Sequence, residues 1–131
     1  YNRIAQIVKN NKYKDRIILY GETTTPEKFY NVMDVFVFPS LYEGFPVTVV
    51  EALASGLNCL ISNSITQEID SNHVEFIGIE ENDINDWVKS ILQIAKYSKR
   101  NDIEEKIIEN FEISNCVKKL EGYYNDFMKE V

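Results

Sequence analysis

Short, nearly continuous apolar runs alternate along this chain with stretches whose apolar residues follow a helical period. The apolar runs are rich in β-branched and aromatic residues, and they predict four strands, at Arg16–Tyr20, Val35–Phe38, Cys59–Ile61 and Val74–Ile77. Helical segments lie between several of these runs. Because helices that separate strands act as crossover connections, the pattern predicts a parallel sheet flanked by helices, in the α/β class.

Proline and glycine positions predict where the inner helices begin and end. Pro26 opens a helix that reaches Met33, and Pro46 opens a second one that runs to Ser55. Gly56 then supplies the left-handed residue that commonly ends a helix. The stretch Ile65–Ile69 predicts a short turn or helix between the third and fourth strands.

Helical periods also dominate both ends of the chain. The residues before Asn10 predict the end of an amphipathic helix, and a strong period near 3.6 follows Asp83. A shorter helix is predicted over Ile103–Phe111, and Ser114 is a candidate cap for the last one. No linker interrupts the pattern, so we expect one domain over residues 1–131, with C-terminal helices from about residue 83 to 131.

Composition narrows the classes of function. The 131 residues are 44% hydrophobic, which suffices for one core, and the formal charge is −7. An acidic chain is a poor partner for nucleic acid or anionic membrane, because both attract basic surfaces. Cys59 and Cys116 have no metal-like spacing, so reduced thiols in a cytosolic protein are favoured over a disulfide. No run of about 18 apolar residues spans a bilayer, no motif predicts a metal site, and no cofactor is expected.

The candidate chemistry lies directly after the second predicted strand. Two carboxylates, Glu43 and Glu51, stand eight positions apart and bracket a helix that begins at Pro46. The first N–H groups of a helix have no partner within it, and they lie at the positive end of its dipole. A phosphate can bind there, with a carboxylate on each flank for sugar hydroxyls. That arrangement suits a nucleotide sugar.

These residues carry a family resemblance as well. Asp34–Pro46, with its Pro-Ser and Glu-Gly-Phe-Pro steps, is followed in fixed order by Glu51–Leu57 and the strand Asn58–Ser62. From Arg16 to about Ala95 the chain resembles the donor-binding, C-terminal domain of a GT-B glycosyltransferase. It is most similar to the large retaining group with two glutamates eight positions apart. The resemblance implies a Rossmann-like sheet and a nucleotide diphosphate sugar as donor.

The resemblance also implies roles for single residues. Glu43 would engage hydroxyls of the donor sugar and serve catalysis, and Glu51 would accept hydrogen bonds from the ribose. The remaining expected donor-binding residues are Tyr42, Gly44, Phe45, Pro46 and Val47 around the helix start, with Gly21 and Glu22 near the nucleobase. Pro46 has no N–H to offer. Tyr42 either contacts the donor or packs in the wall of the site.

Parts of the family pattern are missing from the sequence. It has no counterpart of the Gly-rich turn and the Arg/Lys pair that neutralise the diphosphate, nor of the N-terminal acceptor domain. Because the chain opens at Tyr1 in helix-like sequence, we expect a truncated piece that is inactive alone. The parent enzyme is expected to be cytoplasmic. Through the absent domain it would meet a lipid or glycan acceptor at the inner membrane surface, in bacterial polysaccharide or glycoconjugate synthesis.

Plainer alternatives stay open. In the plainer interpretation Glu43 only complements the positive end of the helix dipole, and Glu51 is an exposed helix acid. Gln67–Asp70 stands where the family usually has a glycine-rich stretch, which leaves contacts there in doubt. His73 is expected to be a surface turn residue and Trp87 a core residue. Two rival functions are a GT-B-fold nucleotide-sugar epimerase and a non-catalytic α/β interaction module.

Overall fold

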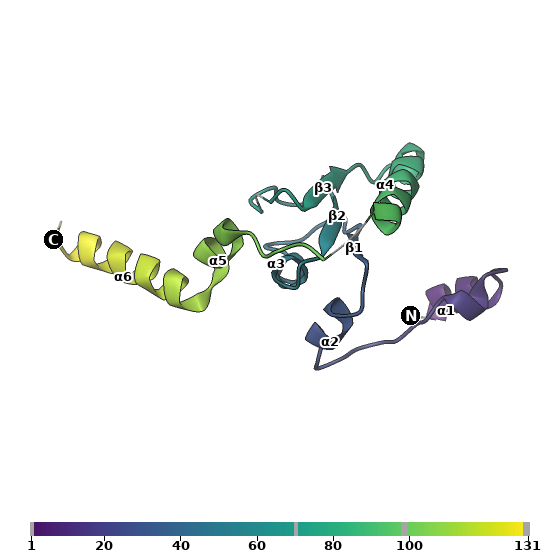
Figure 1. Ribbon diagram of the computed structural model, residues 1–131, viewed down its shortest axis with the longest axis horizontal. Coiled ribbons are helices and arrows are strands. Elements are labelled where there is room, and N and C mark those ends of the chain that lie inside the picture. The colour runs from purple at the N-terminus through teal and green to yellow at the C-terminus, as the bar shows by residue number, and fades with distance from the viewer. Residues whose placement is uncertain (1, 70, 98–99, 130–131) are drawn as a thin grey trace.

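A three-stranded parallel sheet forms the centre of the protein (Figure 1). The computed structural model describes residues 2–69, 71–97 and 100–129. The sheet order is β1-β2-β3, from β1 (Val35–Phe38), β2 (Asn58–Ser62) and β3 (Val74–Ile77). Both pairings are parallel, and Phe36 aligns with Cys59. The predicted α/β class, with helices flanking a parallel sheet, is confirmed.

The central strand explains why its sequence is almost wholly apolar. Cys59 and Ile61 belong to a core on the face covered by α3 (Val47–Ala54), whereas Leu60 points into a second core with Trp87 of α4 (Ile84–Tyr97). Because side chains alternate between faces along a strand, a strand covered on both sides needs apolar residues throughout. Trp87 is buried, as the sequence predicted, and its indole N–H donates to the Gly78 carbonyl at 2.6 Å.

Helix α3 ends as its sequence predicts. Gly56 has φ +75°, its N–H donates to the Leu53 carbonyl at 2.9 Å, and the Leu57 N–H donates to the Ala52 carbonyl at 3.1 Å. This pair of bonds is the Schellman arrangement, which satisfies the last carbonyls of a helix. A Cβ at Gly56 would also lie only 2.5 Å from the Asn101 carbonyl oxygen. The position therefore demands glycine twice, for backbone conformation and for space.

The connection from β2 to β3 has no helix in its described part. A turn at residues 63–64 leads into irregular backbone, so Ile65–Ile69 forms a loop in place of the predicted turn or helix. Ile65 and Ile69 are nevertheless buried in the core beside α3. The loop covers the sheet with two side chains where a helix would otherwise lie. Asp70 falls outside the described residues.

The predicted strand at Arg16–Tyr20 is wrong. Arg16 ends a short 3₁₀ turn (Lys14–Arg16), and the following residues are extended but pair with no strand among the described residues. Ile18 is 84% exposed, and Tyr20 only leans its ring edge-on against Phe29. A strand needs a neighbour for its N–H and C=O groups. The edge of β1 remote from β2 is likewise unpaired in the described chain.

Two short helices flank this extended segment. Helix α1 (Asn2–Lys9) precedes it, in agreement with the predicted amphipathic helix, and has no buried residue. Helix α2 (Glu27–Tyr30) follows it, begins directly after Pro26 and buries Tyr30. The N-terminal segment lies off to one side of the sheet (Figure 1).

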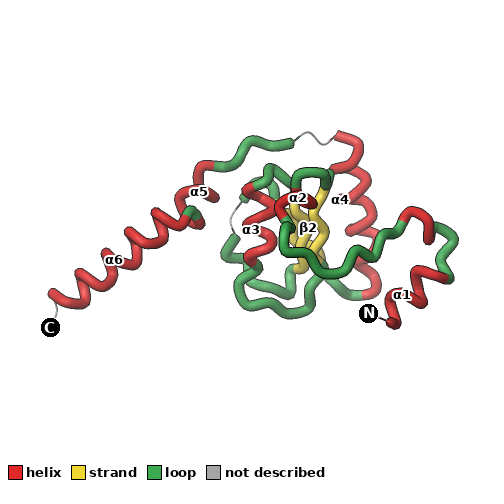
Figure 2. Tube along the Cα trace, turned by 90° about the horizontal axis from the view of Figure 1, so that it is seen from below, coloured by secondary structure: helices red, strands yellow, loops and turns green. Residues whose placement is uncertain are grey.

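The C-terminal helices extend in the opposite direction. Helix α5 (Glu105–Phe111) packs on α3, and α6 (Ile113–Lys129) runs away from the sheet without a buried residue (Figure 2). The predicted cap of α6 is off by two positions. Glu112 precedes the first residue of the helix, its carboxylate accepts a hydrogen bond from the hydroxyl of Ser114, and its carbonyl accepts bonds from the N–H groups of Asn115 and Cys116. Among the described residues, no helix is both long and apolar enough to cross a membrane.

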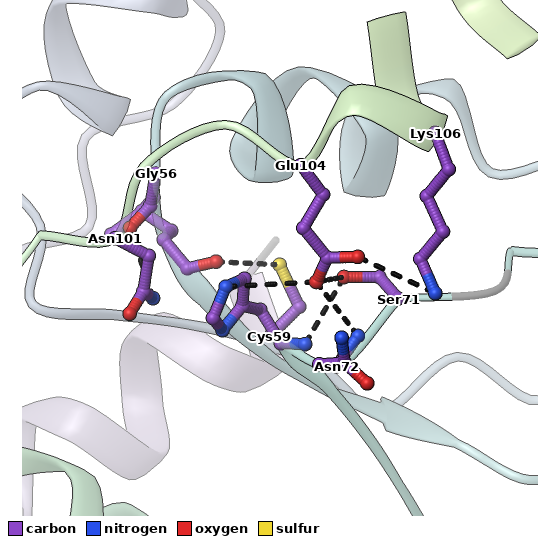
Figure 3. Close-up of polar contacts among 9 residues, drawn as sticks. Gly56, Cys59, Ser71, Asn72, Asn101, Glu104 and Lys106 are labelled. Atoms are coloured by element: carbon purple, nitrogen blue, oxygen red, sulfur yellow. Dashed lines mark hydrogen bonds and ion pairs between the residues drawn. The ribbon is translucent and has the colours of Figure 1, made fainter. Parts of the chain in front are cut away.

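A cluster around Glu104 attaches α5 to the loop before β3 (Figure 3). Glu104 Oε1 accepts hydrogen bonds from Ser71 Oγ at 2.9 Å and from the Asn72 N–H at 2.8 Å, and His73 Nε2 lies 3.6 Å away. The ammonium of Lys106 is 3.4 Å from Oε2. Burial opposes ionisation, but the Ser71 and Asn72 bonds and Lys106 outweigh it, and they hold the pKa of Glu104 below its ordinary value. His73 lies in a turn, as predicted.

Candidate functional site

The site predicted from sequence is built on the loop between β1 and α3. This loop leaves the carboxyl end of β1, the edge of a parallel sheet where ligands commonly bind. Helix α3 begins at Val47, with Pro46 as its N-cap residue, one position later than the sequence suggested. Pro46 is buried, so it anchors the loop on the core while the helix start faces outward.

Several amides at the helix start are available to a ligand. The Val47 N–H donates to the Phe45 carbonyl at 3.0 Å, and the Val49 N–H donates to the Pro46 carbonyl at 2.9 Å. Within the described part of the chain, the N–H groups of Gly44, Phe45 and Thr48 donate to no acceptor. Free donors at the positive end of a helix favour an anion.

Glu43 is held beside the start of α3 by a residue that precedes it. Ser40 Oγ lies 2.8 Å from Glu43 Oε1 and 3.2 Å from the Tyr42 carbonyl oxygen, and Glu43 is half-buried. The hydroxyl of Ser40 thus bonds to the backbone and to a side chain two and three residues later, which restrains the loop. Glu43 Oε2 keeps no hydrogen-bond partner among the described residues, so it can accept from a ligand hydroxyl. Ser40 belongs to the Pro-Ser step of the motif, but the sequence analysis did not predict its hydrogen bond to Glu43.

Glu51 is exposed on α3, between side chains that enter the core. Tyr30 Oη donates a hydrogen bond to Glu51 Oε2 at 3.0 Å from the end of α2. Tyr30 is only 6% exposed, and its ring packs edge-on against Phe36 of β1. Burial, together with the hydrogen bond to the Glu51 carboxylate, raises the pKa of Tyr30 to about 12. Its hydroxyl therefore stays protonated and remains a donor at neutral pH.

Sequence reasoning missed Tyr30 as part of the site. A carboxylate in an apolar helix is costly unless it borders a cleft or finds a partner. The partner comes from a helix 21 residues earlier in the chain. Only the packing of α2 on α3 brings the two side chains together, and spacing in sequence gives no sign of it.

The other predicted residues are spread more widely. Tyr42 is 85% exposed, and Phe45 packs against Phe111 of α5 with ring centroids 5.4 Å apart. Gly21 and Glu22 lie exposed in the coil before α2, where Gly21 has φ +87°. Among the described residues, no hydrogen bond, ion pair or ring contact links this coil to the loop of Glu43.

A hollow of about 610 Å³ lies on the α4 side of the same sheet edge. Apart from Glu80 and Glu81 its lining is apolar, and it includes neither Glu43 nor Glu51; the lining residues are Val37, Pro39, Leu41, Ile79, Glu80, Glu81, Ile84, Trp87, Val88 and Ile91. In the described chain, no three His, Cys, Asp or Glu side chains gather where they could hold a metal ion. Cys59 and Cys116 are both free thiols.

Comparison with known families decides the assignment. Residues 2–97 match the family model described as glycosyl transferases group 1. The chain belongs to this family. The match covers the loop of Glu43, helix α3 and the whole sheet, so the candidate site described above lies inside the matched region.

Individual relatives agree with this assignment. EpsF of Bacillus subtilis is 39% identical over 109 residues, which are 77% of this chain and 28% of EpsF. A galactosyltransferase of Escherichia coli, named UDP-Gal:alpha-D-GlcNAc-diphosphoundecaprenol alpha-1,3-galactosyltransferase, is 32% identical over 88% of this chain and 31% of its own length. CapM of Staphylococcus aureus, a capsular polysaccharide biosynthesis glycosyltransferase, is 31% identical over 87% and 32%. This group 1 chain thus spans less than a third of these relatives. No solved structure matches it.

Proposed function

We propose that this chain is the donor-binding part of an enzyme that transfers a sugar from a nucleoside diphosphate sugar to an acceptor, with retention of anomeric configuration. In that reaction the bond between the anomeric carbon and the phosphate oxygen breaks, and the nucleoside diphosphate leaves. A new bond forms to an acceptor oxygen, which gives up its proton. The observation that carries the proposal is the start of α3. There, backbone N–H groups without an acceptor among the described residues lie beside the loop that carries Glu43, at the end of β1.

The proposed roles combine this geometry with the roles that the family resemblance implies. The amides of Gly44 and Phe45 and the dipole of α3 bind the diphosphate and stabilise it as it leaves. Glu43 orients the hydroxyls of the transferred sugar, and Glu51 accepts hydrogen bonds from the ribose. In this proposal Tyr42, Pro46 and Val47 lie around the bound donor at the start of α3, and Gly21 and Glu22 would lie near the nucleobase.

The rest of the enzyme is part of the same proposal. A basic pair and an acceptor-binding domain are expected in sequence beyond this chain, which would be inactive alone. The Escherichia coli relative is named for a diphosphoundecaprenol acceptor. By analogy, we propose a lipid-linked glycan acceptor, met at the cytoplasmic face of a bacterial membrane, in polysaccharide or glycoconjugate synthesis.

Two substitutions in the full polypeptide that carries this chain test the roles of the glutamates. Glu51→Ala is expected to raise the Kd of the nucleoside diphosphate roughly 10- to 100-fold, because hydrogen bonds to a charged group contribute about 1.5–3 kcal/mol. Glu43→Ala is expected to lower kcat by about 100-fold with little change in that Kd, as for other groups that act in the transition state. Calorimetric titration with UDP, GDP and ADP, together with a sugar-transfer assay, measures both.

Glu121→Ala provides the matched control, because Glu121 is an exposed acid on α6, outside the site. It should leave both quantities unchanged. Wild-type Kd and kcat in both site variants would remove the proposed function.

A further inference from the structure

Glu51 is a long, exposed side chain, and its reach to a ligand depends on how it is oriented. A free glutamate side chain samples many rotamers, and ordering it when a ligand binds weakens the binding. Here Tyr30 Oη is fixed 3.0 Å from Oε2, and no ion pair engages Glu51 in the described chain. The tyrosine is therefore the described group that orients the carboxylate.

Tyr30 is itself held rigidly, which makes it a suitable support. Its ring is buried beneath α3 and contacts Phe36 of β1, with centroids 5.8 Å apart. Its carbonyl oxygen also accepts a hydrogen bond from the guanidinium of Arg100. Tyr30 is thus held at two points: its ring contacts the sheet, and its backbone carbonyl is bonded to Arg100, which follows α4 in the chain.

The bond leaves the carboxylate able to take a diol. Each carboxylate oxygen accepts about two hydrogen bonds, so Oε1 stays open and Oε2 keeps one position. Two neighbouring hydroxyls on a ribose can then be bound by one oriented carboxylate. A group that is fixed before the ligand arrives discriminates more sharply against a ligand that lacks one hydroxyl.

We propose that Tyr30 is a positioning residue that orients the Glu51 carboxylate and thereby sets the preference of the site for a ribonucleotide over a deoxyribonucleotide. The inference rests on the proposed function, because it assigns Glu51 to the ribose. It adds the residue that orients Glu51, and the preference for a ribonucleotide that results from that orientation.

The test compares ligand discrimination, which a purely structural role would not change. Kd values are measured for UDP, GDP and ADP and for their 2′-deoxy forms, with the full polypeptide as wild type, Tyr30→Phe, Glu51→Gln and the double variant. Tyr30→Phe keeps the ring and its packing and removes only the hydroxyl. We expect it to raise the Kd of the ribonucleotide that binds best roughly 5- to 10-fold and to leave the Kd of its 2′-deoxy form nearly unchanged. Tyr97→Phe is the control, because Tyr97 is 70% exposed on α4.

The outcomes separate the inference from the proposed function. If Tyr30→Phe weakens both nucleotides equally, or neither, the positioning role is overturned. If Glu51→Gln abolishes discrimination while Tyr30→Phe preserves it, the proposed function stands and the inference fails. If the wild type does not distinguish the two sugars, or binds none of these nucleotides, both fail. Additive effects in the double variant would also overturn the inference, because a positioning residue must act through Glu51.

Discussion

Both carboxylates of the site receive a hydrogen bond from a hydroxyl that carries no charge. Ser40 serves Glu43, and Tyr30 serves Glu51. A neutral donor orients a carboxylate without cancelling its charge, whereas a lysine or arginine would compete with a ligand hydroxyl for the same oxygens. Glu43 Oε2 and Glu51 Oε1 have no hydrogen-bond partner among the described residues, so the candidate site keeps acceptors that suit hydroxyl groups.

Ser40→Ala tests this arrangement at Glu43. Removal of the hydroxyl should free the side chain and lower kcat roughly 3- to 10-fold, with a smaller effect on the donor KM, because one neutral hydrogen bond contributes about 0.5–1.5 kcal/mol. Steady-state kinetics of the full polypeptide measures the effect. Ser64→Ala is the matched control, since Ser64 is exposed in the turn after β2. Equal kinetics in the two variants would contradict the role of Ser40.

At the scale of elements, α5 connects two regions that are distant in sequence. Its N-terminal end is attached to the loop before β3 through Glu104, and at its C-terminal end Phe111 packs on Phe45 of the site loop. The position of α5 thus depends on an ionised carboxylate and in turn supports the loop that carries Glu43.

Glu104→Gln tests the attachment by its pH dependence. The folded pKa of Glu104 is lowered, so its contribution to stability is present at neutral pH and is lost as pH falls through that pKa. We expect the variant to lose about 1 kcal/mol of unfolding free energy at pH 7 and to lose less at pH 3, where more of the wild-type carboxylate is protonated. Urea denaturation at both pH values measures this. Glu105→Gln, which changes an exposed neighbour, is the control; an equal deficit at both pH values would refute the attachment.

The elements that sequence predicted well are those fixed by local chemistry. Val35–Phe38 became β1 without change, and Gly56 has the left-handed backbone that its position required. Arg16–Tyr20 failed because a strand depends on a partner, which local pattern does not contain. The loop of Glu43 was located from its motif, but Tyr30 was missed because its contact with Glu51 exists only after α2 and α3 pack together.

At the scale of the whole molecule, residues 100–101 join the C-terminal helices to the sheet domain. Arg100 donates to the Ser55 carbonyl at 2.6 Å and to the Met33 carbonyl at 3.2 Å, while the Asn101 N–H donates to the Gly56 carbonyl at 3.1 Å. These bonds satisfy carbonyl groups around the ends of α2 and α3 with a segment that lies more than forty residues later in the chain.

Gly56→Ala should disrupt this junction. The change forces a left-handed alanine, which costs about 1–2 kcal/mol, and its Cβ would displace the Asn101 backbone. We expect a loss of about 2 kcal/mol or more in unfolding free energy, measured by chemical denaturation. Gly122→Ala is the control, because Gly122 lies in α6 with open space around it, where alanine should be neutral or stabilising. Wild-type stability in Gly56→Ala would show that the junction is unimportant.

The unpaired edge of β1 has a practical consequence for anyone who handles these residues as an isolated fragment. Among the described residues, Val35–Phe38 offers a row of open N–H and C=O groups, with the aromatic side chains of Phe36 and Phe38 on one face. Such an edge is a template on which a second copy can add by β-augmentation, and natural proteins normally guard it. Aggregation on concentration would then reflect that edge, and a lysine introduced at Val37, which is 37% exposed, would be the first remedy.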